Sequence, residues 1–278
     1  ASVISAEIEL DKPVTSPAWH DQTLPAVASN GAVNLVVWQD SRIGLDRDIF
    51  AARVDAKTGA LLDPAGIVIS QTGGFQERPS VASDGTDFLV VWEDIRGGTD
   101  YDIYGARVSA AGKVLDSAGF AISAAADDQF APNVASDGTG YLVAWSDHRG
   151  GTDFDIYGAR VSAAGKILDA KGVALSSATG LQGEPTVGFD GTRYLVAWSD
   201  DRGTTLDVRA TRVSTAGAVL DPASILVSGA AGDQQGPRVA ACGAGFLVAW
   251  SDERGSDADL YAARVDGATG NVKDSAGF

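Results

Sequence analysis

The sequence predicts an all-β protein: a five-bladed β-propeller with four antiparallel strands per blade. One motif recurs five times at nearly constant spacing, each copy holds four short strand-like segments separated by turn residues, and no segment shows a helical period. Four-stranded antiparallel sheets repeated around an axis are the blades of a propeller. A sandwich or a solenoid built from the same units is the competing architecture.

Two anchors define the repeat. The first is W-x-D-x-R, whose tryptophans lie 52 to 54 residues apart, and the second is Q-x-x-P, which begins 16 residues before each tryptophan. The constant distance between the anchors indicates that this half of the repeat tolerates no insertion. The anchoring tryptophans are Trp38, Trp92, Trp145, Trp198 and Trp250.

The second repeat illustrates the four expected strands. We expect them at residues 78–83, 88–94, 102–109 and 119–123. The pair Asp84-Gly85 joins the first two, and such pairs favour tight hairpin turns whose residues need positive φ. The second and third strands are apolar on both faces, which suits blades packed between neighbours. We expect Trp92 to lie opposite or near the small Gly105, where Arg107 could stack on the indole.

A single domain is expected over residues 1–278, and its two ends complete each other. The last repeat stops where its fourth strand would begin. In the second repeat a serine ends the fourth strand six residues before the next Q-x-x-P, and Ser16 stands six residues before Gln22. Residues 1–16 are therefore predicted to supply the missing strand and to close the ring without an open edge. The repeats span about 17–70, 71–123, 124–176, 177–228 and 229–278, the last completed by 1–16.

Charge and hydropathy exclude several classes of partner. The net charge of −16 argues against nucleic acid and against an anionic membrane surface. No apolar run is long enough to cross a membrane, so no membrane insertion is expected. The single cysteine, Cys242, excludes an intrachain disulfide and does not decide the compartment. We expect an extracellular or cell-surface monomer.

The acidic loop after each tryptophan has two interpretations. Its aspartates can form a hydrogen-bond network with the arginine of W-x-D-x-R, or they can bind calcium, which prefers carboxylate oxygens. The arginine in each loop opposes a cation, and no D-x-D-x-D-G signature is present. The expected cofactor is therefore none or calcium. The candidate metal ligands are Asp94, Asp100, Asp102, Asp147, Asp153 and Asp155.

A repeated polar face is the predicted site for a ligand. In a propeller, the loop before the first strand and the loop between the second and third strands lie on the same face. That face repeats amide, carboxylate and guanidinium groups, which sugar hydroxyls can use, and several weak sites gain avidity together. Alternatively, these groups satisfy one another and the face is inert. The candidate ligand-binding residues are Gln22, Gln76, Gln129, Gln182 and Gln234 with Arg42, Arg96, Arg149, Arg202 and Arg254.

Strict repetition argues against catalysis, which needs one asymmetric constellation. No nucleophile elbow, P-loop or metal-spaced Cys/His cluster is present. Departures from the repeat are better functional candidates, namely Trp19, His20, His148 and Arg209. A group of acidic residues unique to one or two repeats would favour an enzyme with a single site at the propeller axis.

The motifs Q-x-x-P-x-V, W-x-D-x-R and D-I-Y-x-A-R-V resemble the propeller repeats of bacterial surface and secreted proteins, over almost the whole chain. The five-fold arrangement also looks like five-bladed animal lectins of the tachylectin-2 type, in architecture alone. The resemblance speaks to fold more than to activity. Together with the strict repetition, it leads us to expect a non-catalytic extracellular binding module, lectin-like toward carbohydrate or another small polar ligand. The alternatives are a structural or protein-interaction propeller of a larger surface protein, with a cell-surface carbohydrate or protein as partner, and an enzyme with one axial site.

Overall fold

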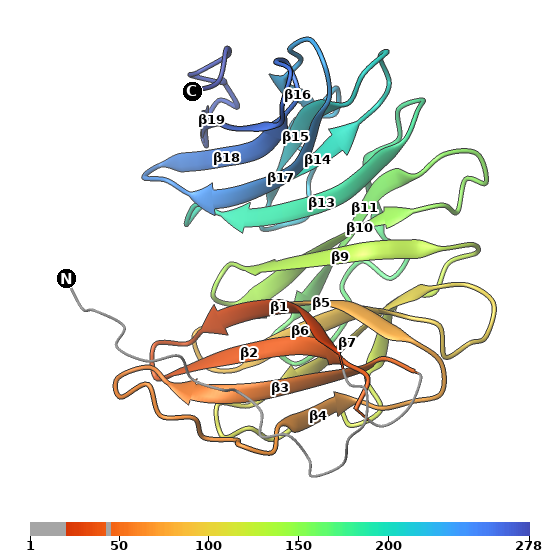
Figure 1. The fold of residues 1–278 in the computed structure, drawn as a ribbon, viewed down its shortest axis with the longest axis vertical. Helices are drawn as coiled ribbons and strands as arrows, with labels where there is room; N and C mark the ends of the chain where they lie inside the picture. The colour runs from red at the N-terminus through yellow and green to blue at the C-terminus, as the bar shows by residue number, and fades with distance from the viewer. Residues whose placement is uncertain (1–20, 43–45) are drawn as a thin grey trace.

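All regular structure in the described part of the chain is β. The computed structural model describes residues 21–42 and 46–278, and it contains nineteen strands in five antiparallel sheets (Figure 1). No described helix is present that could cross a membrane. The predicted closing segment, residues 1–16, lies outside the described residues, as do Trp19 and His20.

The sheets follow one another along the chain, one sheet for each repeat. The first sheet contains β1 (Gln22–Ser29), β2 (Val33–Asp40), β3 (Asp48–Asp55) and β4 (Ile67–Ser70). The second contains β5 (Gln76–Ser83), β6 (Phe88–Asp94), β7 (Asp102–Val108) and β8 (Phe120–Ser123). The third contains β9 (Gln129–Ser136), β10 (Gly140–Asp147), β11 (Asp155–Ser162) and β12 (Val173–Ser176). The fourth contains β13 (Gln182–Phe189), β14 (Arg193–Asp200), β15 (Asp207–Ser214) and β16 (Ile225–Ser228). The fifth contains β17 (Gln234–Ala241), β18 (Gly245–Asp252) and β19 (Asp259–Asp266).

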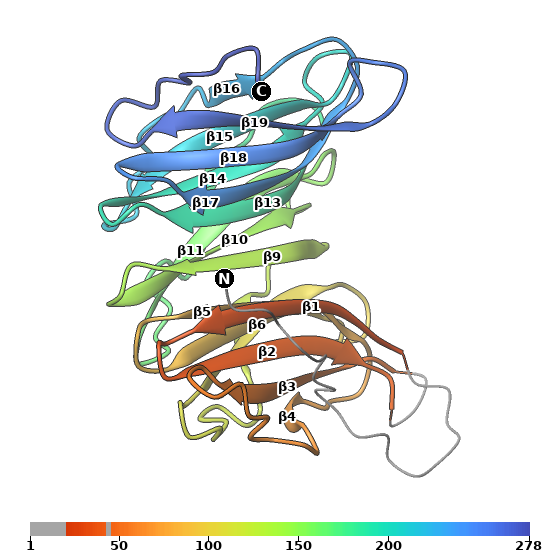
Figure 2. The ribbon, with the colours of Figure 1, turned by 60° about the vertical axis from the view of Figure 1, so that its left-hand side comes forward.

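The sheets are arranged like propeller blades. The first strands β1, β5, β9, β13 and β17 contact one another in that order, so they form the inner edge of the arrangement (Figure 2). The predicted all-β fold and its four-stranded antiparallel sheets are confirmed. The fifth sheet has three described strands. In both views β1 and β17 lie at opposite ends of the series (Figures 1 and 2).

The hydrophobic core lies between neighbouring sheets. Every residue of β6 is buried, because the first sheet covers one of its faces and the third sheet covers the other. Leu89 and Val91 of β6 pack with Tyr141 and Val143 of β10. This explains why the middle strands read as continuous apolar runs instead of alternating patterns.

The tryptophan, aspartate and arginine of the W-x-D-x-R motif form a buried hydrogen-bond network in each blade. In the second sheet the Nε1 of Trp92 donates to Asp94 at 2.7 Å, and the guanidinium of Arg96 donates to the same carboxylate at 2.5 Å. Arg96 also stacks on the ring of Tyr104, 4.0 Å from its centroid. The tryptophan-to-aspartate bond recurs in all five repeats, at 2.6 to 2.9 Å.

Two predicted contacts of this motif are wrong. Trp92 pairs with Tyr104 across the strands, and the small residue against its indole is Gly119, in the turn before β8. Arg107 does not stack on the indole, because its guanidinium forms an ion pair with Asp116 at 2.8 Å. That pair fastens the turn that leads to the fourth strand.

Each first strand carries a bulge. The register shifts between Glu77 and Ser80 in β5, and equivalent shifts occur in the other first strands. The bulged residue has positive φ in every repeat, a conformation that L-residues rarely adopt. These residues are Leu24, Arg78, Ala131, Glu184 and Gly236. The backbone conformation is thus repeated, whereas the residue type at this position differs from blade to blade.

The buried tryptophan of this network gives a prediction on stability. Trp145→Ala should lower the free energy of unfolding by about 3–5 kcal/mol, because it empties a fully buried indole site and leaves Asp147 without one donor. Leu168→Ala, which removes a side chain that is 47% exposed, should change it by less than about 1 kcal/mol. Urea unfolding of both variants checks this, and similar small losses would show that the indole is not a core element.

Candidate active site

The glutamines predicted to bind a ligand lie mostly inside the molecule. Four of them are fully buried, and each donates from Nε2 to carbonyls of the loop that precedes it. Gln182, for example, donates to the carbonyl of Gly180 at 2.7 Å. The other three are Gln76, Gln129 and Gln234. Gln22 is exposed. Ligand binding by this set stays a prediction, and the structure gives the buried members the role of closing a loop.

The predicted arginines are engaged by groups of the protein itself. Each donates to the aspartate two residues before it. The second, third and fifth also stack on a tyrosine ring, at 3.8 to 4.0 Å from its centroid. Arg209, which replaces that tyrosine in the fourth repeat, lies 3.8 Å from both Asp200 and Asp207. The repeated face is therefore largely satisfied by its own groups.

The predicted metal ligands do not converge. Asp94 and Asp147 are occupied by tryptophan and arginine donors, and Asp102 stands directly across the strands from Asp94. In residues 21–42 and 46–278, no group of three or more His, Cys, Asp or Glu side chains is placed to hold a metal ion. These aspartates, with Asp100, Asp153 and Asp155, thus offer calcium no cage in the described structure.

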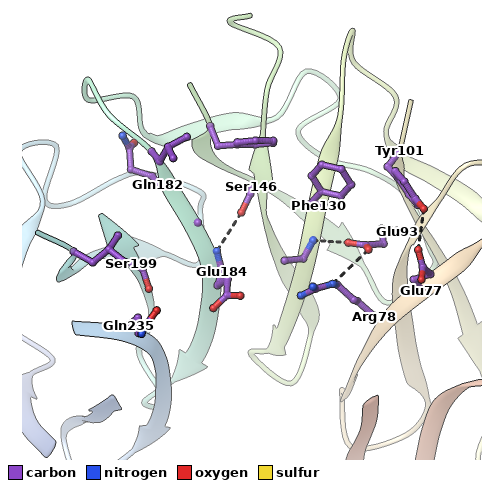
Figure 3. Close-up of a pocket in the computed structure, with 15 residues that line it drawn as sticks. Glu77, Arg78, Glu93, Tyr101, Phe130, Ser146, Gln182, Glu184, Ser199 and Gln235 are labelled. Carbon is purple, nitrogen blue, oxygen red and sulfur yellow. Dashed lines mark hydrogen bonds and ion pairs between the residues drawn. The ribbon is translucent and has the colours of Figure 1, made fainter. Parts of the chain in front are cut away.

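An asymmetric cavity lies where the bulges of the second, third and fourth sheets meet. Its volume is about 600 Å³, and Figure 3 shows the side chains that line it. It is lined by side chains that depart from the repeat, including Glu77, Arg78, Glu93, Tyr101, Phe130 and Glu184. The chain has only six glutamates, and three of the four described ones line this cavity.

Glu93 on β6 is the most unusual of these residues. Its carboxylate accepts a hydrogen bond from the backbone N–H of Ala131 at 2.8 Å. Gln39, Ser146 and Ser199 make the same link to the next blade, so a neutral side chain suffices for it.

The environment of Glu93 favours its protonated form. The side chain is only 5% exposed, and burial raises its pKa to about 7 against the opposing effects of the Ala131 bond and of Arg78. Arg78 lies 3.6 Å away and is itself 54% exposed, so solvent weakens its pull. A carboxyl with this pKa can hold and release a proton near neutral pH.

A second carboxylate has different partners. Glu77 on β5 accepts a hydrogen bond from the hydroxyl of Tyr101 at 2.8 Å and forms an ion pair with Arg47. Burial, together with the bond to Glu77, raises the pKa of Tyr101. Tyr101 therefore keeps its proton and directs it at Glu77.

The third carboxylate lies across the cavity. Figure 3 shows Glu184 on the β13 side, with Glu93 and Glu77 on the other side. The backbone N–H of Glu184 donates to Ser146 at 3.2 Å. Its carboxylate makes no hydrogen bond or ion pair to any residue that the structure describes. Carboxyl groups in such different environments can divide the roles of general acid and general base between them.

The acidic group expected as the mark of an enzyme is thus present, although its members were missed. The sequence feature that could have identified these residues is the rarity of glutamate, since the acidic residues of the repeat are aspartates. Glu77, Glu93 and Glu184 each stand where other repeats carry different residue types. Glu77 and Glu93 are partners across the β5–β6 hairpin, whereas Glu184 reaches the same cavity only through the packing of the second, third and fourth sheets.

No family model matches the chain, and neither does any curated protein. Among solved structures, it is similar to the Trypanosoma rangeli sialidase, with a TM-score of 0.59, 10% identity, and coverage of 89% of this chain and 47% of that one. It is similar to an α-L-arabinofuranosidase from Lactobacillus brevis, with a TM-score of 0.52, 14% identity, and coverage of 90% and 93%. It is also similar to a puromycin-hydrolyzing peptidase of Mycobacterium tuberculosis, with a TM-score of 0.54, 14% identity, and coverage of 93% and 38%. The chain therefore spans less than half of the sialidase and of the peptidase.

These comparisons support the propeller-like fold and correct the predicted function. The prediction of a non-catalytic, lectin-like module is contradicted, because the similar propeller-like chains are enzymes and two of them are glycosidases. That prediction treated five repeats as five equal sites. The structure instead has a cavity lined mostly by residues that the repeats do not share.

The aspartate pairs across the strands give a prediction on pH. Burial and a facing carboxylate raise the pKa of Asp48 and of Asp102 to about 6. The folded state therefore holds protons that the unfolded chain releases, so this stabilisation is complete below about pH 4 and is lost as pH rises through 6. Hydrogen bonds from Arg254 lower the pKa of Asp252 to about 2, and that contribution is lost only as pH falls toward 2.

We expect the free energy of unfolding to be higher at pH 5 than at pH 8, by on the order of 1–2 kcal/mol after solvent screening. Urea unfolding at both values measures the difference. Asp102→Asn should reduce it, since the amide does not titrate. Equal stability at pH 5 and pH 8 would contradict the assignment.

Proposed function

We propose that this protein is a hydrolase of glycosidic bonds that acts in the cavity between the second, third and fourth sheets. The observation that carries the proposal is Glu93, a buried carboxyl with a pKa near 7 at a position where neutral side chains make the same structural link. The glycosidases of similar fold support it, at low identity. The extracellular location remains a prediction.

The chemistry needs one proton donor and one carboxylate on the opposite side of the sugar. Glu93 gives its proton to the glycosidic oxygen as the bond between that oxygen and the anomeric carbon breaks. Glu184 takes a proton from water, whose oxygen forms the new bond to the anomeric carbon. Glu77 and Tyr101 are placed to hydrogen-bond the sugar hydroxyls, and Arg78 limits the pKa of Glu93.

A second assignment rests on the Tyr101–Glu77 hydrogen bond. In it, Glu77 accepts the Tyr101 proton while the phenolic oxygen bonds to the anomeric carbon and Glu93 protonates the departing glycosidic oxygen. Water that gives a proton to Glu93 then displaces the phenolate, which recovers its proton from Glu77, and Glu184 is not needed. The two assignments differ in their variants. Glu184→Gln abolishes turnover in the first, whereas Tyr101→Phe abolishes it in the second and only weakens binding in the first.

Glu93→Gln should lower kcat by at least about 10³-fold without unfolding the chain, because Gln39 makes the same inter-blade link with an amide. The rate of the parent protein should fall as pH rises through about 7, where the donor loses its proton. Release of nitrophenol from a panel of aryl glycosides measures both. The matched control is Glu253→Gln, a glutamate outside the cavity, which should keep the parental rate. Full activity in Glu93→Gln, or no hydrolysis of any glycoside by the parent, would overturn the proposal.

We also propose that the five blades close into a ring, with residues 1–16 completing the fifth sheet. A hydrogen bond that recurs between neighbouring blades is incomplete at the two ends of the described structure. Arg53 donates to the carbonyl of Ala110 in the next blade at 2.9 Å, and the equivalent arginines of the next three sheets do the same. Arg264 is the fifth of these, and its side chain is 55% exposed. Its counterpart on the first blade is the carbonyl of Ala56.

The apolar positions at the two ends also support closure. Val27 on β1 is 64% exposed, whereas Val81 on β5 is 8% exposed. Leu260 on β19 is 86% exposed, although Ile103 at the same place on β7 is fully buried. The backbone of Phe278 pairs with that of Ala262. The fourth strand begins in this register in the other sheets, so the edge of β19 can accept a fourth strand.

Closure of the ring predicts that equivalent arginines contribute equally to the melting temperature. If the ring is closed, Arg264→Ala should lower the melting temperature about as much as Arg107→Ala, because both remove an ion pair and an inter-blade bond. If the ring is open, Arg264→Ala costs only its exposed pair with Asp274, and the shift should be much smaller. Deletion of residues 1–16 should lower the melting temperature and promote association through the β19 edge. A monomeric truncated chain with an unchanged melting temperature would contradict closure.

A further inference from the structure

Three aromatic rings and one imidazole form a continuous row beside the acidic cavity. The ring centroids of Tyr101 and Phe130 are 5.1 Å apart, those of Phe130 and Phe154 are 5.8 Å apart, and those of Phe154 and His148 are 4.8 Å apart. Tyr101, Phe130 and Phe154 line the cavity, and His148 touches the far side of Phe154. We call these four residues the aromatic row.

The aromatic row is not part of the repeat. The position of Tyr101 and Phe154 holds Arg47, Leu206 and Ala258 in the other repeats. The position of Phe130 holds threonine, glutamate, glycine and glutamine, and that of His148 holds serine, isoleucine, aspartate and glutamate. The fold therefore does not require aromatic side chains here.

Burial points the same way. All four residues are half-buried, and none belongs to the hydrophobic clusters that fill the spaces between the described sheets. Large rings left partly exposed along a cavity are a feature of ligand sites, where they supply apolar contact beside a few polar groups. Here the polar groups are Glu77, Glu93 and Glu184.

We propose that the aromatic row binds successive units of a neutral oligosaccharide chain, and that the protein acts on such chains. The inference rests on the proposed function for its reaction and names the substrate class. Each sugar ring has an apolar face that can lie on an aromatic ring, and successive rings in the row are spaced about as far apart as successive units of a chain. Glu77, Glu184 and Asp128 lie near the row and disfavour an anionic sugar through like-charge repulsion, whereas Glu93 favours its protonated form and adds little charge.

The test uses Glu93→Gln, so that binding is measured without turnover. Isothermal titration with neutral hexasaccharides of arabinose, xylose and glucose should detect at least one ligand. A galacturonate hexasaccharide should bind at least tenfold more weakly than the best neutral one. Adding Phe154→Leu should weaken the best neutral ligand by at least tenfold and leave its monosaccharide unit almost unaffected. Leucine is compatible with the fold because Leu206 occupies the same place in the fourth repeat. Phe75→Ala, at an exposed ring outside the row, is the control and should bind like Glu93→Gln alone.

The outcomes separate this inference from the proposed function. Unchanged affinity in the Phe154→Leu variant, preference for the galacturonate chain, or no binding of any neutral hexasaccharide overturns the inference, even if the parent protein hydrolyses small glycosides. Binding that depends on Phe154, in a parent protein that hydrolyses nothing, supports the aromatic row and overturns the hydrolase.

Discussion

The structure depends on one buried carboxylate that recurs in every blade. Asp94 is fully buried, and a buried anion is tolerated only when donors surround it. Trp92 supplies one donor from the core, and Arg96 supplies others from the loop. The same guanidinium stacks on Tyr104 and donates to a carbonyl in the turn before β8. One charge thus joins the second strand, the loop, the third strand and the entrance to the fourth.

The pairing of these repeated charged groups determines where a ligand can bind. Because the repeated aspartates and arginines satisfy one another, the face that carries them offers few free groups to a ligand. The bulge in each first strand has the opposite property, since its backbone is fixed and its side chain varies. Arg78, Ala131 and Glu184 occupy that place in three successive blades. A symmetric scaffold with variable bulge positions can therefore carry one asymmetric site. Glu184 is itself a bulge residue, and Glu77 and Glu93 form the strand pair beside the bulge of β5.

The sequence predicted the parts of the fold that depend on local chemistry. The strand segments, the Asp84-Gly85 turn with Gly85 at φ 92°, and the Asp–Arg network follow from residue type and spacing. The role of Gln182 could not be predicted, because its burial depends on a loop and a neighbouring blade. Glu93 was missed for a similar reason. Its pKa is set by burial between β6 and the bulge of β9, and no local pattern encodes that environment.

The central claim is that the pKa of Glu93 lies near 7, so that the carboxyl can give up a proton near neutral pH, and its titration tests this most directly. The side-chain carboxyl resonance can be followed by carbon-13 NMR across pH 3 to 9 and assigned by its absence in Glu93→Gln. The account predicts a midpoint near pH 7. A midpoint near 4.5, the ordinary value for glutamate, would show that the carboxyl is ionised at neutral pH and would remove the proton donor from the proposed reaction.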